Sequence, residues 1–113
     1  GDACLREVAR ALRACLQEGD LIARYGGEEF TVFLPGRGGA AARAVAEQLR
    51  MEVESLRPEC GGVLLRLTVS VGVATRLEHE EGPEATLARA DRALYAAKAA
   101  GRNCVQVAPA VFR

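Results

Sequence analysis

Two glycines followed by two glutamates, Gly26-Gly27-Glu28-Glu29, are the residues of this chain best suited to chemistry. Glycines at a turn adopt positive φ and let a ligand approach the backbone. Adjacent carboxylates repel each other unless a cation or solvent relieves them, and Mg²⁺ usually takes one or two carboxylates together with substrate phosphates. The segment therefore indicates a divalent cation beside a phosphate ester, although an ordinary solvent-exposed turn explains the same four residues.

The composition limits the chain to one domain with a modest core. Half of its 113 residues are hydrophobic, and 15 basic residues balance 15 acidic ones. A globular fold is therefore expected, and the charge balance argues against nucleic acid or a membrane surface as a partner. No apolar run is long enough to span a membrane. The four scattered cysteines are predicted to be free thiols in a reducing cytoplasm: Cys4, Cys15, Cys60 and Cys104.

Apolar residues at helical spacing predict three helices that could position the turn. They cover residues 3–17, 42–56 and 87–97. Gly101 then provides a natural helix stop. The first helix precedes the turn, and the other two follow it.

Short apolar stretches predict four strands, which cover residues 21–24, 30–34, 65–74 and 104–107. The first two flank the glycines and glutamates, so they form a β-hairpin with these residues at its tip. Residues 65–74 alternate strictly, which indicates one buried face. Residues 58–62 are predicted as a turn and residues 76–83 as a charged loop. This order of elements predicts an α+β fold with a mostly antiparallel sheet and flanking helices.

Four segments together resemble one known family. They are the opening Gly1-Asp2, RYGGEEF at residues 24–30, TVSVGVA at 68–74 and ADRALYAAKAAGRN at 90–103. In this order along the chain they resemble the GGDEF family, the diguanylate cyclases, in the GGEEF spelling. The resemblance covers the whole chain. Residues 1–113 are therefore expected to form a GGDEF domain, with a nucleotidyl-cyclase or palm-like fold related to the ferredoxin-like folds.

The resemblance implies an activity and an assembly. Diguanylate cyclases join two GTP molecules into cyclic di-GMP and release two pyrophosphates. Two domains face each other as a homodimer, so that each 3′-hydroxyl attacks the α-phosphate of the other nucleotide. The family requires Mg²⁺ or Mn²⁺. A sensory or receiver domain on the N-terminal side is also expected.

The resemblance assigns roles at the turn by position. Glu28 matches a metal ligand that is also the presumed proton acceptor for the 3′-hydroxyl, and Glu29 matches a second metal ligand. Gly26 and Gly27 match residues that lie against the nucleotide, where a side chain would collide.

Three more residues match substrate-binding positions. Lys98 and Arg102 match the pair that holds the β- and γ-phosphates, and Asp2 matches the carboxylate that recognises the guanine edge. Simpler readings exist for all three. Lys98 suits a helix C-terminus, Arg102 could be a surface cation, and Asp2 suits a helix N-cap.

Three other residues, whose types often act in catalysis, are interpreted as non-catalytic. Asp91 could cap a loop or orient the sheet. Tyr95 is expected to be a packed aromatic residue with a hydrogen-bonded hydroxyl. His79 lies between two glutamates in the charged loop and is expected to be solvated.

The chain departs from the family at an inhibitory product site, which is written RxxD. Asp20 is in place, but the arginine position holds Gln17. Glutamine carries no charge and lacks the guanidinium fork. Weak or absent inhibition by the product is therefore expected.

The family also has a strand ahead of the segment that Gly1-Asp2 matches, with another metal-binding aspartate. That strand is not within residues 1–113, so the chain is expected to be an N-terminally truncated domain that pairs with another chain or rearranges its sheet. The isolated fragment is expected to be inactive although its parent is a cyclase. The alternative is a non-catalytic signalling module that binds GTP or a partner protein and regulates a neighbouring domain.

Overall fold

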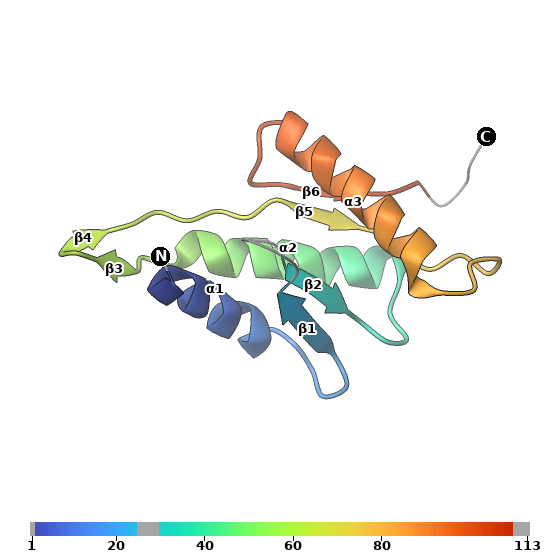
Figure 1. The fold of residues 1–113 in the computed structure, drawn as a ribbon, viewed down its shortest axis with the longest axis horizontal. Coiled ribbons are helices and arrows are strands. Elements are labelled where there is room, and N and C mark those ends of the chain that lie inside the picture. The colour runs from blue at the N-terminus through green and yellow to red at the C-terminus, as the bar shows by residue number, and fades with distance from the viewer. Residues whose placement is uncertain (1, 25–29, 110–113) are drawn as a thin grey trace.

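The computed structural model describes residues 2–24 and 30–109 of the chain. Within these ranges the elements occur in the order α1 (Asp2–Ala14), β1 (Leu21–Arg24), β2 (Phe30–Phe33), α2 (Gly39–Ser55), β3 (Glu59–Cys60), β4 (Val63–Leu64), β5 (Val71–Val73), α3 (Pro83–Ala99) and β6 (Val105–Val107) (Figure 1). The expected α+β fold with flanking helices is confirmed, and its sheets are short.

Strands pair only two at a time within the described residues. β1 with β2 and β3 with β4 form antiparallel pairs, whereas β5 and β6 run parallel, with Val71 opposite Val105. A parallel pair needs a crossover connection, and α3 provides it. The expectation of a mostly antiparallel arrangement therefore holds for two of the three pairs.

Helix α3 packs directly on the β5–β6 pair, and α2 contacts the same two strands (Figure 1). β5 approaches α3 closely at Gly72. A Cβ atom built there would lie 2.3 Å from the Ala90 carbonyl oxygen and 2.3 Å from the Leu94 amide nitrogen. Only glycine fits a strand whose backbone lies this close to a helix. Gly72 therefore sets the distance between β5 and the helix that carries Lys98.

A second cluster of apolar side chains joins α1 to α2. Val8 and Leu12 from α1 pack with Leu49 and Val53 from α2, and Val53 is fully buried. Ile22 of β1, Phe30 of β2, Leu67 and Val69 are partly buried against this cluster. The spacing of four residues between Val8 and Leu12 places both on one helix face. This core supports the β1–β2 hairpin through Ile22 and Phe30.

The predicted strand over residues 65–74 is wrong for residues 65–70. Only Val71–Val73 pairs in a ladder, although the Leu65 amide hydrogen-bonds to the Pro58 carbonyl. The alternation nevertheless marked the buried face correctly, because Leu67 and Val69 do contact the core. Alternation reports which side of an extended chain is buried, whereas a strand also requires a neighbour at hydrogen-bonding distance.

The turn predicted at residues 58–62 is instead a small antiparallel hairpin. Glu59 pairs with Leu64 and Cys60 pairs with Val63, around Gly61 and Gly62 at positive φ. The two glycines allow this tight reversal. Helices α1, α2 and α3 begin or end a few residues from their predicted limits, and the cysteines at all four positions are free.

Candidate nucleotide-binding site

The β1–β2 hairpin frames the segment with the paired glutamates. Leu21 lies opposite Phe33 and Ile22 opposite Val32, so the predicted antiparallel hairpin is confirmed. The four residues that were singled out first lie outside the described residues: Gly26, Gly27, Glu28 and Glu29. Their roles remain predictions, and the hairpin is the element that would position them.

An ion pair closes the base of this hairpin. Asp20 precedes β1 and Arg37 follows β2, and the guanidinium of Arg37 donates to the Asp20 carboxylate. The backbone N–H of Gln17 donates to the other carboxylate oxygen at 2.7 Å. The Arg37 hydrogen bond, followed by the Gln17 N–H, lowers the pKa of Asp20. Both oxygens of Asp20, whose side chain is only 3% exposed, are therefore engaged within the chain.

The two predicted phosphate-binding cations lie at the C-terminal end of α3. Lys98 is in the last turn of the helix, and the exposed Arg102 follows three residues after the helix ends. The Arg102 N–H donates to the Ala97 carbonyl at 3.0 Å, and the Gly101 N–H donates to the Lys98 carbonyl at 3.4 Å. These two bonds form a Schellman motif, in which Gly101 supplies the left-handed residue. The helix end therefore brings both cations to the same region.

Asn103, which was not predicted to have a role, ties the turn after α3 to other parts of the domain. Its backbone N–H donates to the Ser70 hydroxyl oxygen at 3.1 Å. Its side-chain amide donates to Glu54 Oε2 at 2.6 Å, and its side-chain oxygen accepts from Arg50 at 3.0 Å. Gly101 indicated the end of the helix, but nothing in the segment indicated that α2 supplies the partners of Asn103.

The remaining predicted residues have simpler surroundings. Asp2 is the first residue of α1, and its guanine-binding role remains a prediction. His79 is exposed, as expected for a solvated histidine, and Asp91 is exposed as well. Tyr95 was expected to be packed, and this is wrong because its side chain is 77% exposed. Ala93 and Ala97 take the positions of α3 that face the strands, which leaves Tyr95 on the opposite face.

The predicted charged loop at residues 76–83 contains a buried acid. Glu80 and Arg89 form an ion pair at 2.7 Å, with each side chain 4% exposed. Glu80 also accepts from the Leu77 N–H and the Thr86 hydroxyl, and Arg89 donates to the Thr75 carbonyl. The Arg89 hydrogen bond, followed by the Leu77 N–H, strongly lowers the pKa of Glu80. This network fastens the loop to α3.

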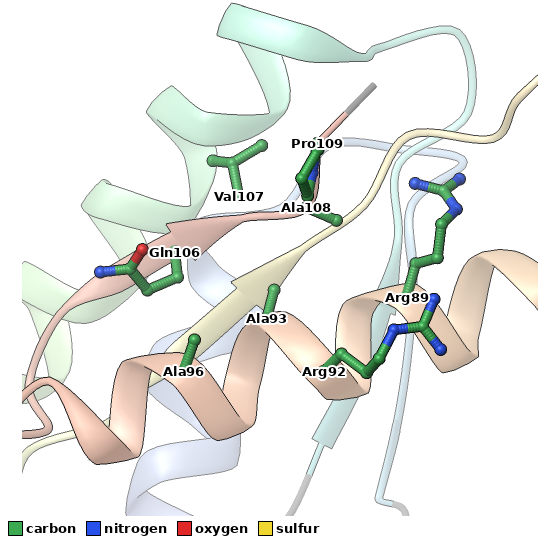
Figure 2. A pocket seen from close by; sticks show the side chains of 8 residues that line it. All are labelled: Arg89, Arg92, Ala93, Ala96, Gln106, Val107, Ala108 and Pro109. Atoms are coloured by element: carbon green, nitrogen blue, oxygen red, sulfur yellow. The ribbon is translucent and has the colours of Figure 1, made fainter. Parts of the chain in front are cut away.

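A pocket of about 170 Å³ lies between α3 and β6 (Figure 2). Figure 2 shows Ala93 and Ala96 pointing from α3 toward the strand, with Arg92 at one side. The pocket is lined by Arg89, Arg92, Ala93, Ala96, Gln106, Val107, Ala108 and Pro109. Neither Lys98 nor Arg102 lines it, so it is separate from the predicted phosphate-binding pair.

Comparison with known proteins assigns the chain to a family. The family model described as "Diguanylate cyclase, GGDEF domain" matches residues 1–104. This chain belongs to the GGDEF family. Its sequence is 42% identical over 105 residues to Diguanylate cyclase A of Treponema denticola, covering 93% of this chain and 28% of that protein. It is 43% identical over 107 residues to Response regulator PleD of Caulobacter vibrioides, covering 93% of this chain and 24% of that protein. The domain thus spans about a quarter of the length of these curated relatives.

A solved structure supports the fold of this GGDEF domain. The GGDEF domain of DgcB from Caulobacter crescentus, in complex with c-di-GMP, is 36% identical and superposes with a TM-score of 0.86. The match covers 95% of this chain and 64% of that chain. In the described part of the domain, none of the helices is both long and apolar enough to cross a membrane.

The carboxylates of the GGDEF domain suit a divalent cation. Glu28 and Glu29 offer hard oxygen ligands, which is the donor type that Mg²⁺ and Mn²⁺ take. Among residues 2–24 and 30–109, no group of three or more histidine, cysteine, aspartate or glutamate side chains is placed to hold a metal ion.

Proposed function

We propose that this GGDEF domain is the catalytic domain of a diguanylate cyclase, which condenses two GTP molecules into cyclic di-GMP and two pyrophosphates. The observation that carries the proposal is that the family match includes the four charged side chains to which the resemblance assigns metal or phosphate binding in the two long motifs. Glu28, Glu29, Lys98 and Arg102 are all present. Similar proteins named diguanylate cyclases support the same activity. A module that had lost catalysis would be expected to lack one of these four side chains.

In the proposed reaction, the 3′-hydroxyl oxygen of one GTP attacks the α-phosphorus of the other. The new O3′–Pα bond forms as the bond from Pα to the bridging oxygen breaks, and pyrophosphate leaves. The hydroxyl proton passes to the carboxylate of Glu28. Repeating the step with the nucleotides in exchanged roles closes the ring. Catalysis of this kind depends on positioning and on neutralising phosphate charge.

The cations at the end of α3 would hold the leaving group. Lys98 and Arg102 lie where the Schellman motif ends the helix, and the exposed side chain of Arg102 is accessible to a triphosphate. A guanidinium can bind phosphate oxygens through two parallel hydrogen bonds, which adds geometric specificity to the charge attraction. Asp2, at the start of α1, would accept hydrogen bonds from the guanine edge.

The proposed enzyme works as a homodimer, because each domain binds one GTP and both nucleotides react. Its proposed location is the cytoplasm. Glu28 and Glu29 would hold Mg²⁺ or Mn²⁺, which when bound neutralises phosphate charge. The relative named as a response regulator supports an input domain on the N-terminal side in this protein also.

The test is product formation from GTP and Mg²⁺ by the full-length protein, followed by chromatography. We expect cyclic di-GMP from the unaltered protein and a loss of at least about 100-fold in rate for Glu28→Ala. Glu28→Asp keeps the carboxylate and should retain part of the rate. GTP binding without any product would instead identify a non-catalytic module that regulates a neighbouring domain.

A further inference from the structure

We infer that Asn103 is a positioning residue for the phosphate-binding guanidinium of Arg102, acting by tying the turn that carries Arg102 to helix α2. This inference rests on the proposed function, since it concerns how the GTP triphosphate is held. It assigns a task to a group of residues on α2 that the proposed reaction does not itself use.

The backbone around Arg102 is in an unusual conformation. Gly101, Arg102 and Asn103 have φ values of 117°, 65° and 46° in succession. Glycine adopts such angles without steric cost, and asparagine does so more readily than most residues, but arginine rarely does. Strained backbone of this kind persists only where surrounding contacts over-determine it, and it gathers at functional sites. The turn therefore needs contacts that hold it.

The helix C-cap alone does not provide all of these contacts. The Schellman bonds from Gly101 and Arg102 already satisfy the carbonyls of Lys98 and Ala97. A helix can end with those two bonds and one glycine. Asn103 adds three further bonds beyond the cap, and they lead to α2 and to the residue before β5 rather than back to α3. Arg102 is thus held from both sides.

The partners on α2 are themselves fixed. Arg50 has a side chain that is only 17% exposed, and it forms ion pairs with Glu47 at 3.2 Å and Glu54 at 3.4 Å. Its guanidinium and the Glu54 carboxylate approach the two ends of the Asn103 amide. Hydrogen bonds to charged groups are about twice as strong as neutral ones. The Asn103 amide is therefore clamped between a cation and an anion.

The amide is the group that fits this position. Its oxygen can only accept and its nitrogen can only donate, which matches Arg50 on one side and Glu54 on the other. The Asn103 hydrogen bond is also the leading cause that lowers the pKa of Glu54. An aspartate at 103 would place a second carboxylate against Glu54, and an alanine would leave both α2 groups without this partner.

The experiment compares GTP with GMP binding in the full-length protein by titration calorimetry. GMP lacks the β- and γ-phosphates, so Arg102 should not contribute to its affinity. We expect Asn103→Ala to weaken GTP binding about ten- to fifty-fold, as loss of a positioned charge-assisted phosphate contact does. GMP affinity should change by less than about two-fold. Gln106→Ala serves as the matched control, because it removes a different side-chain amide, which lies on β6, and it should change neither affinity.

Two further variants separate positioning from a general loss of structure. In an Arg102→Ala background, Asn103→Ala should weaken GTP binding by less than about two-fold more, because the two residues act on the same contact. Asn103→Asp should weaken GTP binding, and adding Glu54→Gln should restore most of it, since the glutamine amide can donate to the new carboxylate.

Equal weakening of GTP and GMP by Asn103→Ala would overturn the inference, as would an undiminished effect in the Arg102→Ala background. Failure of the double variant to recover would also contradict it. These outcomes are distinct from a failure of the proposed function. In that case the unaltered protein binds GTP but forms no cyclic di-GMP, and the comparison of GTP with GMP still reports on Asn103.

Discussion

Replacing Gly72 by alanine tests how closely β5 packs on α3. The added Cβ would lie 2.3 Å from the Ala90 oxygen, 2.3 Å from the Leu94 nitrogen and 2.8 Å from Leu94 Cα. All three are backbone atoms of α3, so no side chain can rotate to make room. Optimal contacts between heavy atoms are about 3.5–4.0 Å. The strand and the helix must therefore move apart by about 1 Å.

The cost follows from this movement. Overpacking that forces the backbone to shift typically costs about 1–3 kcal/mol, and clashes with backbone atoms place Gly72→Ala toward the upper end. For a domain of this size, about 1 kcal/mol lowers the melting temperature by about 4 °C. We therefore expect the melting temperature to fall by about 4–12 °C.

The assay is thermal unfolding followed by circular dichroism, with Gly82→Ala as the matched control. A Cβ at Gly82 would meet only the end of the Glu84 side chain, 2.3 Å away at Oε2, and Glu84 is exposed and can rotate. Gly82 is the residue before α3, so its replacement should cost less than about 1 kcal/mol. If Gly72→Ala is no more destabilising than Gly82→Ala, the close packing of β5 on α3 is refuted.

Two further predictions concern charged groups. The pKa of Glu80 in the folded protein lies below its usual value of 4.5, so the stabilisation from this carboxylate is complete above that value and is lost as pH falls through the lowered pKa. Glu80→Gln should therefore lower the melting temperature at neutral pH and make the decline of the melting temperature toward about pH 3 shallower. Glu78→Gln, in the same loop but exposed, should change neither. Parallel curves of melting temperature against pH for Glu80→Gln and the unaltered protein would contradict this. Asp20 is already paired with Arg37, and Gln17 supplies no charge at the arginine position, so we expect added cyclic di-GMP to change the initial rate of product formation by less than about two-fold. Strong inhibition that Asp20→Asn abolishes would show that prediction to be wrong.

The sequence predicted the helices well because helical periodicity is a local property. Positions such as Val8 and Leu12, or Leu49 and Val53, mark a buried face without any knowledge of what covers it. The β1–β2 hairpin was predicted for a similar reason, since two glycines between apolar stretches favour a local reversal.

Pairing between distant segments could not be predicted in the same way. The alternation at residues 65–74 was equally clear throughout, yet only Val71–Val73 has a strand beside it in the described part of the chain. Glu80 and Arg89 are nine residues apart on a loop and a helix, so neither charge pattern nor periodicity indicates that they are buried together.

The candidate site shows the same division. Lys98 and Arg102 were identified from their motif, and the structure places them on either side of the end of α3. Arg37 and Asn103 were missed because their partners, Asp20 and Glu54, lie 17 and 49 residues away. Such contacts depend on tertiary packing, which a motif read along the chain does not contain. The paired glutamates remain predicted from the sequence, outside the described residues.

The measurement that tests the central claim most directly is the stoichiometry of products from GTP. Phosphorus NMR of the full-length protein with GTP and Mg²⁺ follows nucleotide and pyrophosphate together. The proposed reaction releases two pyrophosphates for each cyclic di-GMP, with no accumulation of GDP or inorganic phosphate, and Glu28→Ala should abolish both products. GDP and phosphate as the products, or unchanged turnover in Glu28→Ala, would contradict the account.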